Sequence, residues 1–256
     1  MTTDLPVITT SLLDRAVQLA KDAVLLDCIG VITGPNGAGK SIALQTIKNR
    51  YPSSGLEGNA LYHRACATQG HTRGVKDVLF EFGIREAHVS SSNLQIACKL
   101  GLREFSNRKI KLLLLDEADS MAKDSLVGIV TLIDYCNGHG HSLGLVMAAA
   151  QPISGWLAAN SAGMSRTVRS ERADNMGVEE MLAILREWVP GLATLIAQAK
   201  GNPEALKLTR LIHKGVGDGN FRRMSFFAGL LRQEQCVNEE SIRQVLARIA
   251  LIPSKP

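Results

Sequence analysis

The sequence predicts an α/β protein whose mainly parallel sheet is followed by a smaller, all-helical domain. Between Cys28 and Gln151, short apolar runs alternate with segments of helical periodicity, which is the pattern of βαβ units. From Val178 onward the chain shows helical periodicity alone. A polar stretch with several arginines, residues 160–175, separates the two patterns. We therefore expect a core domain over residues 1–175 and a helical lid domain over residues 176–256.

The core domain is expected to begin with an amphipathic helix near Ser11, since apolar residues recur at helical spacing after it. Four consecutive leucines, residues 112–115, are closed by Asp116 and Glu117 and predict a strand buried on both faces. The expected strands are 28–33, 60–68, 110–115 and 142–150, and the helices between them are 41–49, 72–82, 92–108 and 121–135. Ligands of such sheets bind outside the carboxyl ends of the strands, so the functional residues are sought there.

The C-terminal part has helical patterns separated by glycine, proline and asparagine. The expected helices are 181–188, 192–199, 203–213, 221–232 and 239–251. From Lys200 to Pro256 there are ten Lys and Arg residues against five Asp and Glu residues. Both a nucleic-acid-binding patch and an ordinary solvated helical surface remain open from this charge alone.

Composition narrows the class of protein. The 256 residues carry a formal net charge of +5 and are enough to bury a sizeable core. Five scattered cysteines form no C-x-x-C pair, so neither a disulfide framework nor a structural zinc site is expected. No apolar run approaches the ~18 residues of a membrane span, and the first residues lack the pattern of a signal peptide. We expect a cytoplasmic protein with no membrane partner.

The strongest motif follows the first predicted strand. Its sequence, Gly-Pro-Asn-Gly-Ala-Gly-Lys-Ser, matches G-x-x-x-x-G-K-[ST] with a strand before it and a helix after it. Lys40 is expected to reach the β- and γ-phosphates of a nucleotide, and the Ser41 hydroxyl to ligate Mg²⁺. The backbone of the six preceding residues would cradle the phosphates: Gly34, Pro35, Asn36, Gly37, Ala38 and Gly39. The motif predicts binding of a nucleoside triphosphate.

A pair of carboxylates supplies the second half of the predicted site. Asp116 ends the leucine strand and is expected to hold the Mg²⁺ shell. Glu117 is expected to activate a water in line with the γ-phosphate. Asp119 is interpreted as the N-cap of the following helix. Two adjacent carboxylates near one metal favour hydrolysis over transfer to a small acceptor.

With both nucleotide motifs and a helical C-terminal domain, the sequence resembles the AAA+ ATPases, whose Walker A (P-loop) and Walker B motifs these are. The resemblance implies ATP with Mg²⁺ as the cofactor and two readers of the γ-phosphate: Gln151 at the end of a strand, where the family more often has Asn, Thr or Ser, and Arg222 in Gly-Asn-Phe-Arg. It also implies an arginine finger toward a neighbouring subunit, for which the order of preference is Arg166, Arg169 and then Arg172. ABC-type ATPases share this phosphate-loop sequence, but the chain has no Leu-Ser-Gly-Gly-Gln-like signature between the two motifs, which excludes that family.

Among AAA+ proteins the sequence is most similar to transposition target-selection ATPases, the phage Mu B protein and the TnsC and TniB regulators. The resemblance implies a bacterial or phage-encoded protein that assembles on double-stranded DNA as a ring or filament, without sequence preference, and recruits a transposase. Its ATP hydrolysis would dismantle the assembly. Four basic residues on predicted helices are the candidate DNA contacts: Arg73, Lys76, Lys99 and Arg103. Ordinary solvated helix faces are the equally weighted alternative for these four.

Two other functions stay open at this point. A helicase loader or insertion-sequence helper ATPase would share all these motifs and differ in its partner. A monomeric P-loop kinase would share only the phosphate loop and would neither assemble nor require DNA.

Overall fold

The computed structural model describes residues 10–26, 28–51, 58–67, 70–83, 93–153, 157, 168–198, 203–234 and 236–250. The chain divides into two compact units. The first, called here the sheet unit, contains the described residues of Ser11–Gly34 and Lys40–Ala173. The second, the helical unit, contains Thr10, residues 35–39 and the described residues from Asp174 onward.

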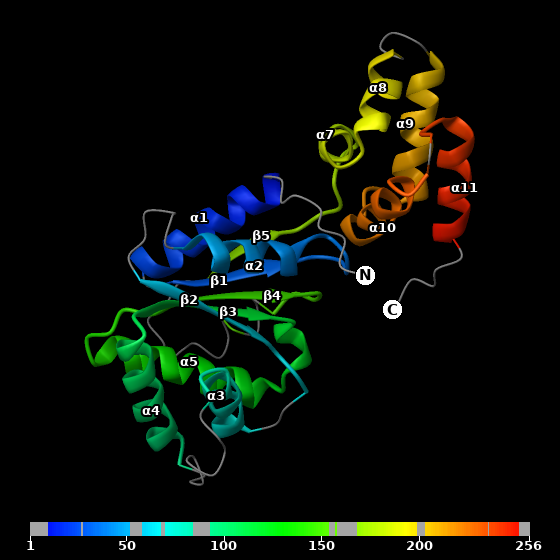
Figure 1. Ribbon diagram of the computed structural model, residues 1–256. Coiled ribbons are helices and arrows are strands. Elements are labelled where there is room, and N and C mark those ends of the chain that lie inside the picture. The colour runs from blue at the N-terminus through cyan, green and yellow to red at the C-terminus, as the bar shows by residue number, and fades with distance from the viewer. Residues whose placement is uncertain are drawn as a thin grey trace. The chain divides into compact units, whose positions relative to one another are not determined.

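The sheet unit is built on a five-stranded, wholly parallel sheet in the order β2-β3-β4-β1-β5 (Figure 1). The strands are β1 (Ile29–Thr33), β2 (Asn59–Arg64), β3 (Ile110–Asp116), β4 (Gly144–Ala149) and β5 (Val168–Arg172). The predicted α/β fold with a mainly parallel sheet is confirmed.

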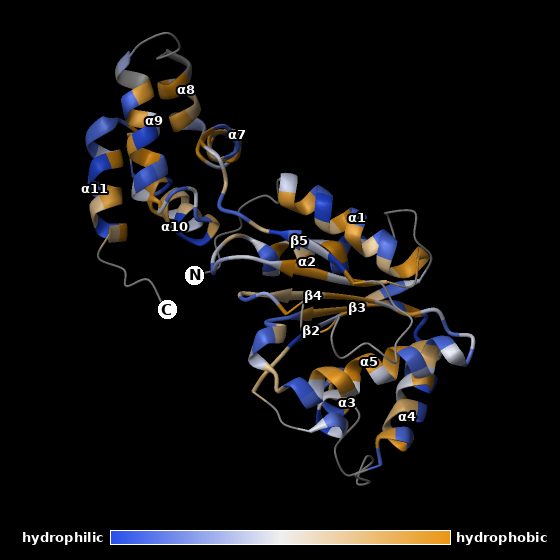
Figure 2. Cartoon of the chain, turned by 180° about the vertical axis from the view of Figure 1, so that it is seen from behind, coloured by the Kyte–Doolittle hydropathy of each residue, from blue (hydrophilic) through white to orange (hydrophobic). Residues whose placement is uncertain are grey.

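Helices cover both faces of this sheet. Helices α1 (Ser11–Leu25) and α2 (Lys40–Arg50) lie on one face (Figure 1). Helices α3 (His71–Phe80), α4 (Leu94–Asn107) and α5 (Lys123–Gly138) lie on the other, and the 3₁₀ turn η3 (Ala118–Ser120) precedes α5. All four leucines of β3 are fully buried, and alternate ones, Leu113 and Leu115, pack into the α3–α5 side of the core. Because both faces are covered, the central strands are hydrophobic along their length, as Figure 2 shows.

Glycines let α1 approach the sheet closely. A Cβ atom at Gly30 of β1 would lie 2.7 Å from the Leu19 side chain, and one at Gly144 would lie 2.9 Å from the Ala23 backbone. Helix α1 is also joined to β5, since Arg15 pairs with Glu171 at 3.2 Å and donates to the Arg172 carbonyl at 3.0 Å. The helix before the first strand is therefore an integral layer of the sheet unit.

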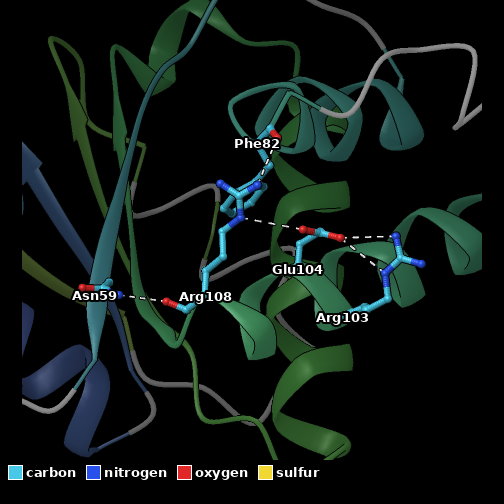
Figure 3. A network of polar contacts seen from close by, with 5 residues as sticks. All are labelled: Asn59, Phe82, Arg103, Glu104 and Arg108. Carbon is cyan, nitrogen blue, oxygen red and sulfur yellow. Dashed lines mark hydrogen bonds and ion pairs between the residues drawn. The ribbon is translucent and has the colours of Figure 1, made fainter.

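A polar network fixes the start of β2 (Figure 3). The Arg108 guanidinium lies 4.7 Å from the centre of the Phe82 ring and 3.7 Å from the Glu104 carboxylate, and it donates to the Phe82 carbonyl at 3.2 Å. The backbone carbonyl of Arg108 accepts a hydrogen bond from the Asn59 side chain at 2.8 Å. The turn between α4 and β3 thereby anchors the first residue of β2.

The helical unit contains α7 (Val178–Trp188), α8 (Pro190–Gln198), α9 (Pro203–Gly215), α10 (Phe221–Leu231) and α11 (Glu239–Ala250). Its core is apolar and includes Trp188, Met224 and Phe227, with Trp188 edge-on to Phe221 at 5.5 Å. The described residues of this unit have no strand, and the helical C-terminal portion predicted from periodicity is confirmed.

Three local predictions are wrong. The stretch 160–175 contains a fifth strand, β5, which was not expected because Val168 is its only strongly apolar residue. It lies at the sheet edge and pairs with β1 through the backbone, so it needs no apolar pattern. The strand predicted over 60–68 ends at Arg64. Asp119 is not a helix N-cap: α5 is preceded by Ala122, and Asp119 lies in η3.

Among the described residues, no helix is both long enough and apolar enough to cross a membrane.

Candidate functional site

The carboxyl ends of the strands meet at one edge of the sheet. In the strand register, Arg64 of β2 stands opposite Asp116 of β3, and Thr33 of β1 stands opposite both Ala149 of β4 and Arg172 of β5. The phosphate loop follows Thr33, Glu117 follows Asp116, and Gln151 comes shortly after Ala149. The predicted nucleotide residues of the sheet unit are thus brought to the edge where parallel sheets bind ligands.

The start of the phosphate loop requires glycine. Gly34 has φ +154°, and a Cβ there would lie 1.9 Å from the Ala173 carbonyl oxygen, which no side chain could tolerate. Lys40, the first residue of α2, is only 9% exposed, and its Nζ donates to the Gly34 carbonyl at 2.6 Å. The Lys40 side chain thereby bonds back to the first residue of the loop.

Asp116 is held by donors on both carboxylate oxygens. Only 2% of the residue is exposed; Oδ1 accepts the Glu117 backbone N–H at 3.0 Å, and Oδ2 accepts the Tyr62 hydroxyl at 2.7 Å. Burial, and then this hydrogen bond to Asp116, raise the pKa of Tyr62 to about 12. The phenol stays protonated at neutral pH and therefore acts as a donor to the carboxylate.

Glu117 is directed by its backbone and by a cation. Its φ of 54° and ψ of 38° lie in the left-handed region, which is uncommon for a residue with a Cβ and turns the side chain at the strand end. Its Oε1 lies 2.5 Å from Arg64 Nη2 on the neighbouring strand. The bonded carboxylate raises the pKa of the Arg64 guanidinium, so this partner stays charged. In the structure Glu117 is therefore engaged with Arg64 through Oε1.

Asp119 links β3 to the residue before Gln151. Its Oδ2 accepts the backbone N–H of Ala150 at 3.1 Å. Gln151 itself is exposed, and it follows a strand whose residues are all buried. The acid predicted to cap a helix instead fixes the turn after β4.

The three arginines proposed as fingers differ in their settings. Arg166 lies outside the described residues. Arg169 is on β5 and pairs with Asp22 of α1 at 2.5 Å, so it is engaged within its own chain. Arg172 ends β5, where its side chain is exposed and its carbonyl accepts from Arg15.

Within the helical unit, the N-terminus of α10 contacts residues 35–39. Asn220 caps the helix by accepting the Arg223 N–H at 3.2 Å, and its amide donates to the Asn36 carbonyl at 2.9 Å. The Arg222 backbone N–H donates to the Gly37 carbonyl at 3.4 Å. Gly37 has φ +85°, and a Cβ there would lie 2.4 Å from the Asn220 side chain. Arg222, in the first turn of α10, therefore follows a cap residue that hydrogen-bonds to the backbone of the phosphate loop.

The four predicted DNA contacts lie on the two neighbouring helices α3 and α4 of the same layer (Figure 1). Arg73 pairs with Asp77 at 3.1 Å, and Arg103 pairs with Glu104 at 3.2 Å (Figure 3). Lys99 is exposed and Lys76 is half-buried. The structure thus groups the four residues on one side of the sheet unit and engages the two arginines with carboxylates of their own helices.

Two residues of the site, Tyr62 and Arg64, were not predicted from the sequence. Both lie on β2, two residues apart, so they share one face of the strand, while His63 between them points to the other face and contacts Glu81 at 2.9 Å. The sequence feature that could have pointed to them is the alternation of Tyr62, His63 and Arg64 along this strand. The strand order that makes β2 the neighbour of β3 is not readable from the residues themselves.

The oxygen donors at this edge fit a hard divalent cation. Ser41 and Asp116 supply a hydroxyl and a carboxylate, the oxygen donors that Mg²⁺ prefers. Each Asp116 oxygen accepts one hydrogen bond from a described donor and keeps a lone pair for a cation or its water shell. A bound Mg²⁺ would neutralise phosphate charge and orient the nucleotide.

Comparison with known proteins identifies the class. Residues 27–157 match the family model described as AAA domain, and the chain belongs to this family. It is accordingly an ATPase of the AAA class. No curated protein matches the sequence.

Solved structures with the same fold include proteins from archaea and bacteria. The ORC2 protein of Aeropyrum pernix, in ADPNP and ADP complexes, is similar with a TM-score of 0.68 and 14% identity, over 100% of this chain and 72% of that one. The ORC1 protein of Aeropyrum pernix in complex with DNA gives 0.59 and 14%, over 97% and 68%. Domain III of the replication initiation protein DnaA of Thermotoga maritima gives 0.57 and 15%, over 94% and 92%. At these identities the likeness shows a shared fold.

Proposed function

We propose that this protein is an ATP-hydrolysing regulator that assembles on double-stranded DNA and is released from it by hydrolysis. The observation that carries the proposal is that β1, which leads into the phosphate loop, and β3, which ends in Asp116 and is followed by Glu117, end at the same edge of the sheet. In this proposal Lys40 binds the phosphates, Ser41 and Asp116 hold Mg²⁺, and Glu117 activates the attacking water.

In this proposal the bound nucleotide also controls assembly, through residues that contact its γ-phosphate. Gln151 and Arg222 read the γ-phosphate, as the resemblance to AAA+ ATPases implies. An arginine of the 166–172 stretch reaches the nucleotide of a neighbouring subunit, where a guanidinium would match phosphate oxygens. Because Arg169 is engaged with Asp22, its use as a finger would require that ion pair to open. ATP binding would then favour assembly, and hydrolysis would reverse it.

Duplex DNA is proposed to bind the basic residues of α3 and α4. Contacts from Arg73, Lys76, Lys99 and Arg103 to phosphates would give affinity without sequence preference and a strong dependence on salt. The likeness to ORC1, solved in complex with DNA, supports a DNA-binding role for this fold.

The partner is proposed to be a transposase. The support is the sequence resemblance to the phage Mu B protein and the TnsC and TniB regulators. A second candidate, a loader of a replicative helicase, is favoured by the structural likeness to DnaA, a replication initiation protein. Copurification of one partner or the other decides between them.

The proposal is tested by light scattering and electron microscopy with duplex DNA and a slowly hydrolysed ATP analogue. We expect rings or filaments on DNA that require the nucleotide and dissolve at high salt. Lys40→Ala should abolish this assembly, and Glu117→Gln should trap it in the presence of ATP, whereas Lys48→Ala, an exposed lysine at the other end of α2, should change neither. Isolated monomers under all conditions would refute the proposal and favour a kinase.

A further inference from the structure

Tyr62 contacts Asp116, the carboxylate proposed to hold Mg²⁺, from a neighbouring strand. Its hydroxyl donates to Asp116 Oδ2 at 2.7 Å and accepts from Gln45 Nε2 of α2 at 3.4 Å. The chain of contacts from Gln45 through Tyr62 to Asp116 therefore joins the helix that follows the phosphate loop to the end of β3. The roles proposed above do not use the Tyr62 hydroxyl.

The position of Asp116 makes this donor important. The residue is almost fully buried, and its Oδ1 accepts a backbone N–H that the turn itself supplies. Oδ2 has the Tyr62 hydroxyl as its described donor, so the hydroxyl sets the plane of the carboxylate. A buried carboxylate oxygen that loses its donor is left poorly solvated and turns toward other partners.

We propose that Tyr62 is a positioning residue that holds Asp116 in the orientation in which it receives the Mg²⁺ of the bound nucleotide. Partners that orient a metal ligand from behind typically contribute as much as 10- to 100-fold to metal affinity. The inference rests on the proposed ATP-binding function and adds to it a residue outside both nucleotide motifs.

The test measures nucleotide binding with and without the metal. The full-length chain and its Tyr62→Phe variant are titrated with a fluorescent ATP analogue in excess Mg²⁺ and again in EDTA. We expect Tyr62→Phe to weaken binding in Mg²⁺ by about tenfold or more and to leave binding in EDTA unchanged. The phenylalanine ring keeps the packing of the half-buried strand position, and a thermal melt verifies the fold.

Two further variants sharpen the result. Tyr135→Phe, at a tyrosine of α5 stacked on His139, should match the wild type in both titrations. Gln45→Ala removes the weaker contact from an exposed position and should reduce Mg²⁺-dependent binding by less than Tyr62→Phe does.

The outcomes separate this inference from the function beneath it. If the wild type binds no nucleotide, the proposed function fails. If the wild type binds with Mg²⁺ dependence and Tyr62→Phe keeps that dependence, the positioning role is overturned while the proposed function stands. An equal loss in Mg²⁺ and in EDTA would also overturn it, because the hydroxyl would then act on the fold or the nucleotide and not on the metal.

Discussion

Removing Arg64 is expected to raise the basal ATPase rate. Arg64 Nη2 lies 2.5 Å from Glu117 Oε1, so the proposed base is engaged by a cation in the structure. If this pair must open before Glu117 can accept a proton from water, the free energy needed to open it adds to the activation barrier for hydrolysis. Arg64→Ala removes the pair and leaves the Glu117 backbone geometry in place.

The structure sets the size of the effect. The side chains are 66% and 44% exposed, so solvent screens the pair and its contribution is about 0.2–1 kcal/mol. Since RT is about 0.59 kcal/mol, removing Arg64 enlarges the fraction of Glu117 that is not paired with this arginine by roughly 1.4- to 5-fold. We expect kcat to rise by that factor and KM for ATP to remain unchanged, because neither Arg64 nor Glu117 is among the residues proposed to bind the phosphates.

The assay is steady-state phosphate release without DNA. Arg243→Ala is the matched control, since Arg243 and Glu239 form a comparably exposed pair at 2.6 Å on α11. That variant should leave kcat unchanged. A fall in kcat for Arg64→Ala would refute the reasoning, since it would mean that Arg64 holds Glu117 in its active orientation.

Two other predictions concern stability. Asp119→Ala removes the acceptor for the Ala150 N–H and should lower the free energy of unfolding by about 1 kcal/mol, whereas Asp119→Asn keeps an acceptor and should not; equal losses in urea unfolding would contradict this. Burial lowers the pKa of His141, whose Nε2 contacts the Ile110 carbonyl at 2.7 Å, below its ordinary value of 6.5. The unfolded chain therefore binds a proton that the folded chain lacks, and the free energy of unfolding should fall below pH 6.5 by at most about 1.4 kcal/mol per pH unit. His141→Gln should flatten this dependence in urea titrations at successive pH values, and an unchanged slope would assign it to other groups.

The sequence predicted the parts of the fold that depend on burial. The leucines of β3 and the apolar β4 are covered on both faces, so their strand character is visible as uninterrupted apolar runs. Strand β5 was missed because an edge strand is held by backbone pairing, which places little demand on its side chains. Asp119 was misassigned because an acid before a helix has the composition of a cap, while its actual partner, Ala150, is distant in sequence.

The candidate site follows the same division. Residues within the motifs, such as Lys40 and Asp116, could be proposed from the sequence because the motif spacing along the chain reflects the chemistry of phosphate and metal binding. Tyr62 and Arg64 act across strands, and their relevance depends on β2 lying beside β3 in the sheet. No local sequence pattern shows which strands are neighbours in the sheet, so these two residues can be identified only once the fold is known.

Strand β2, at the edge of the sheet, also positions the carboxylates of the candidate site. One of its faces presents Tyr62 to Asp116 and Arg64 to Glu117, so a single strand contacts both carboxylates of the site. On its other face His63 contacts Glu81, the C-cap residue that follows α3. Helix α3, one of the two helices proposed to bind DNA, is therefore joined to the strand that contacts Asp116 and Glu117. A shift of β2 relative to β3 would change the surroundings of both carboxylates together, because their described side-chain partners move as one element.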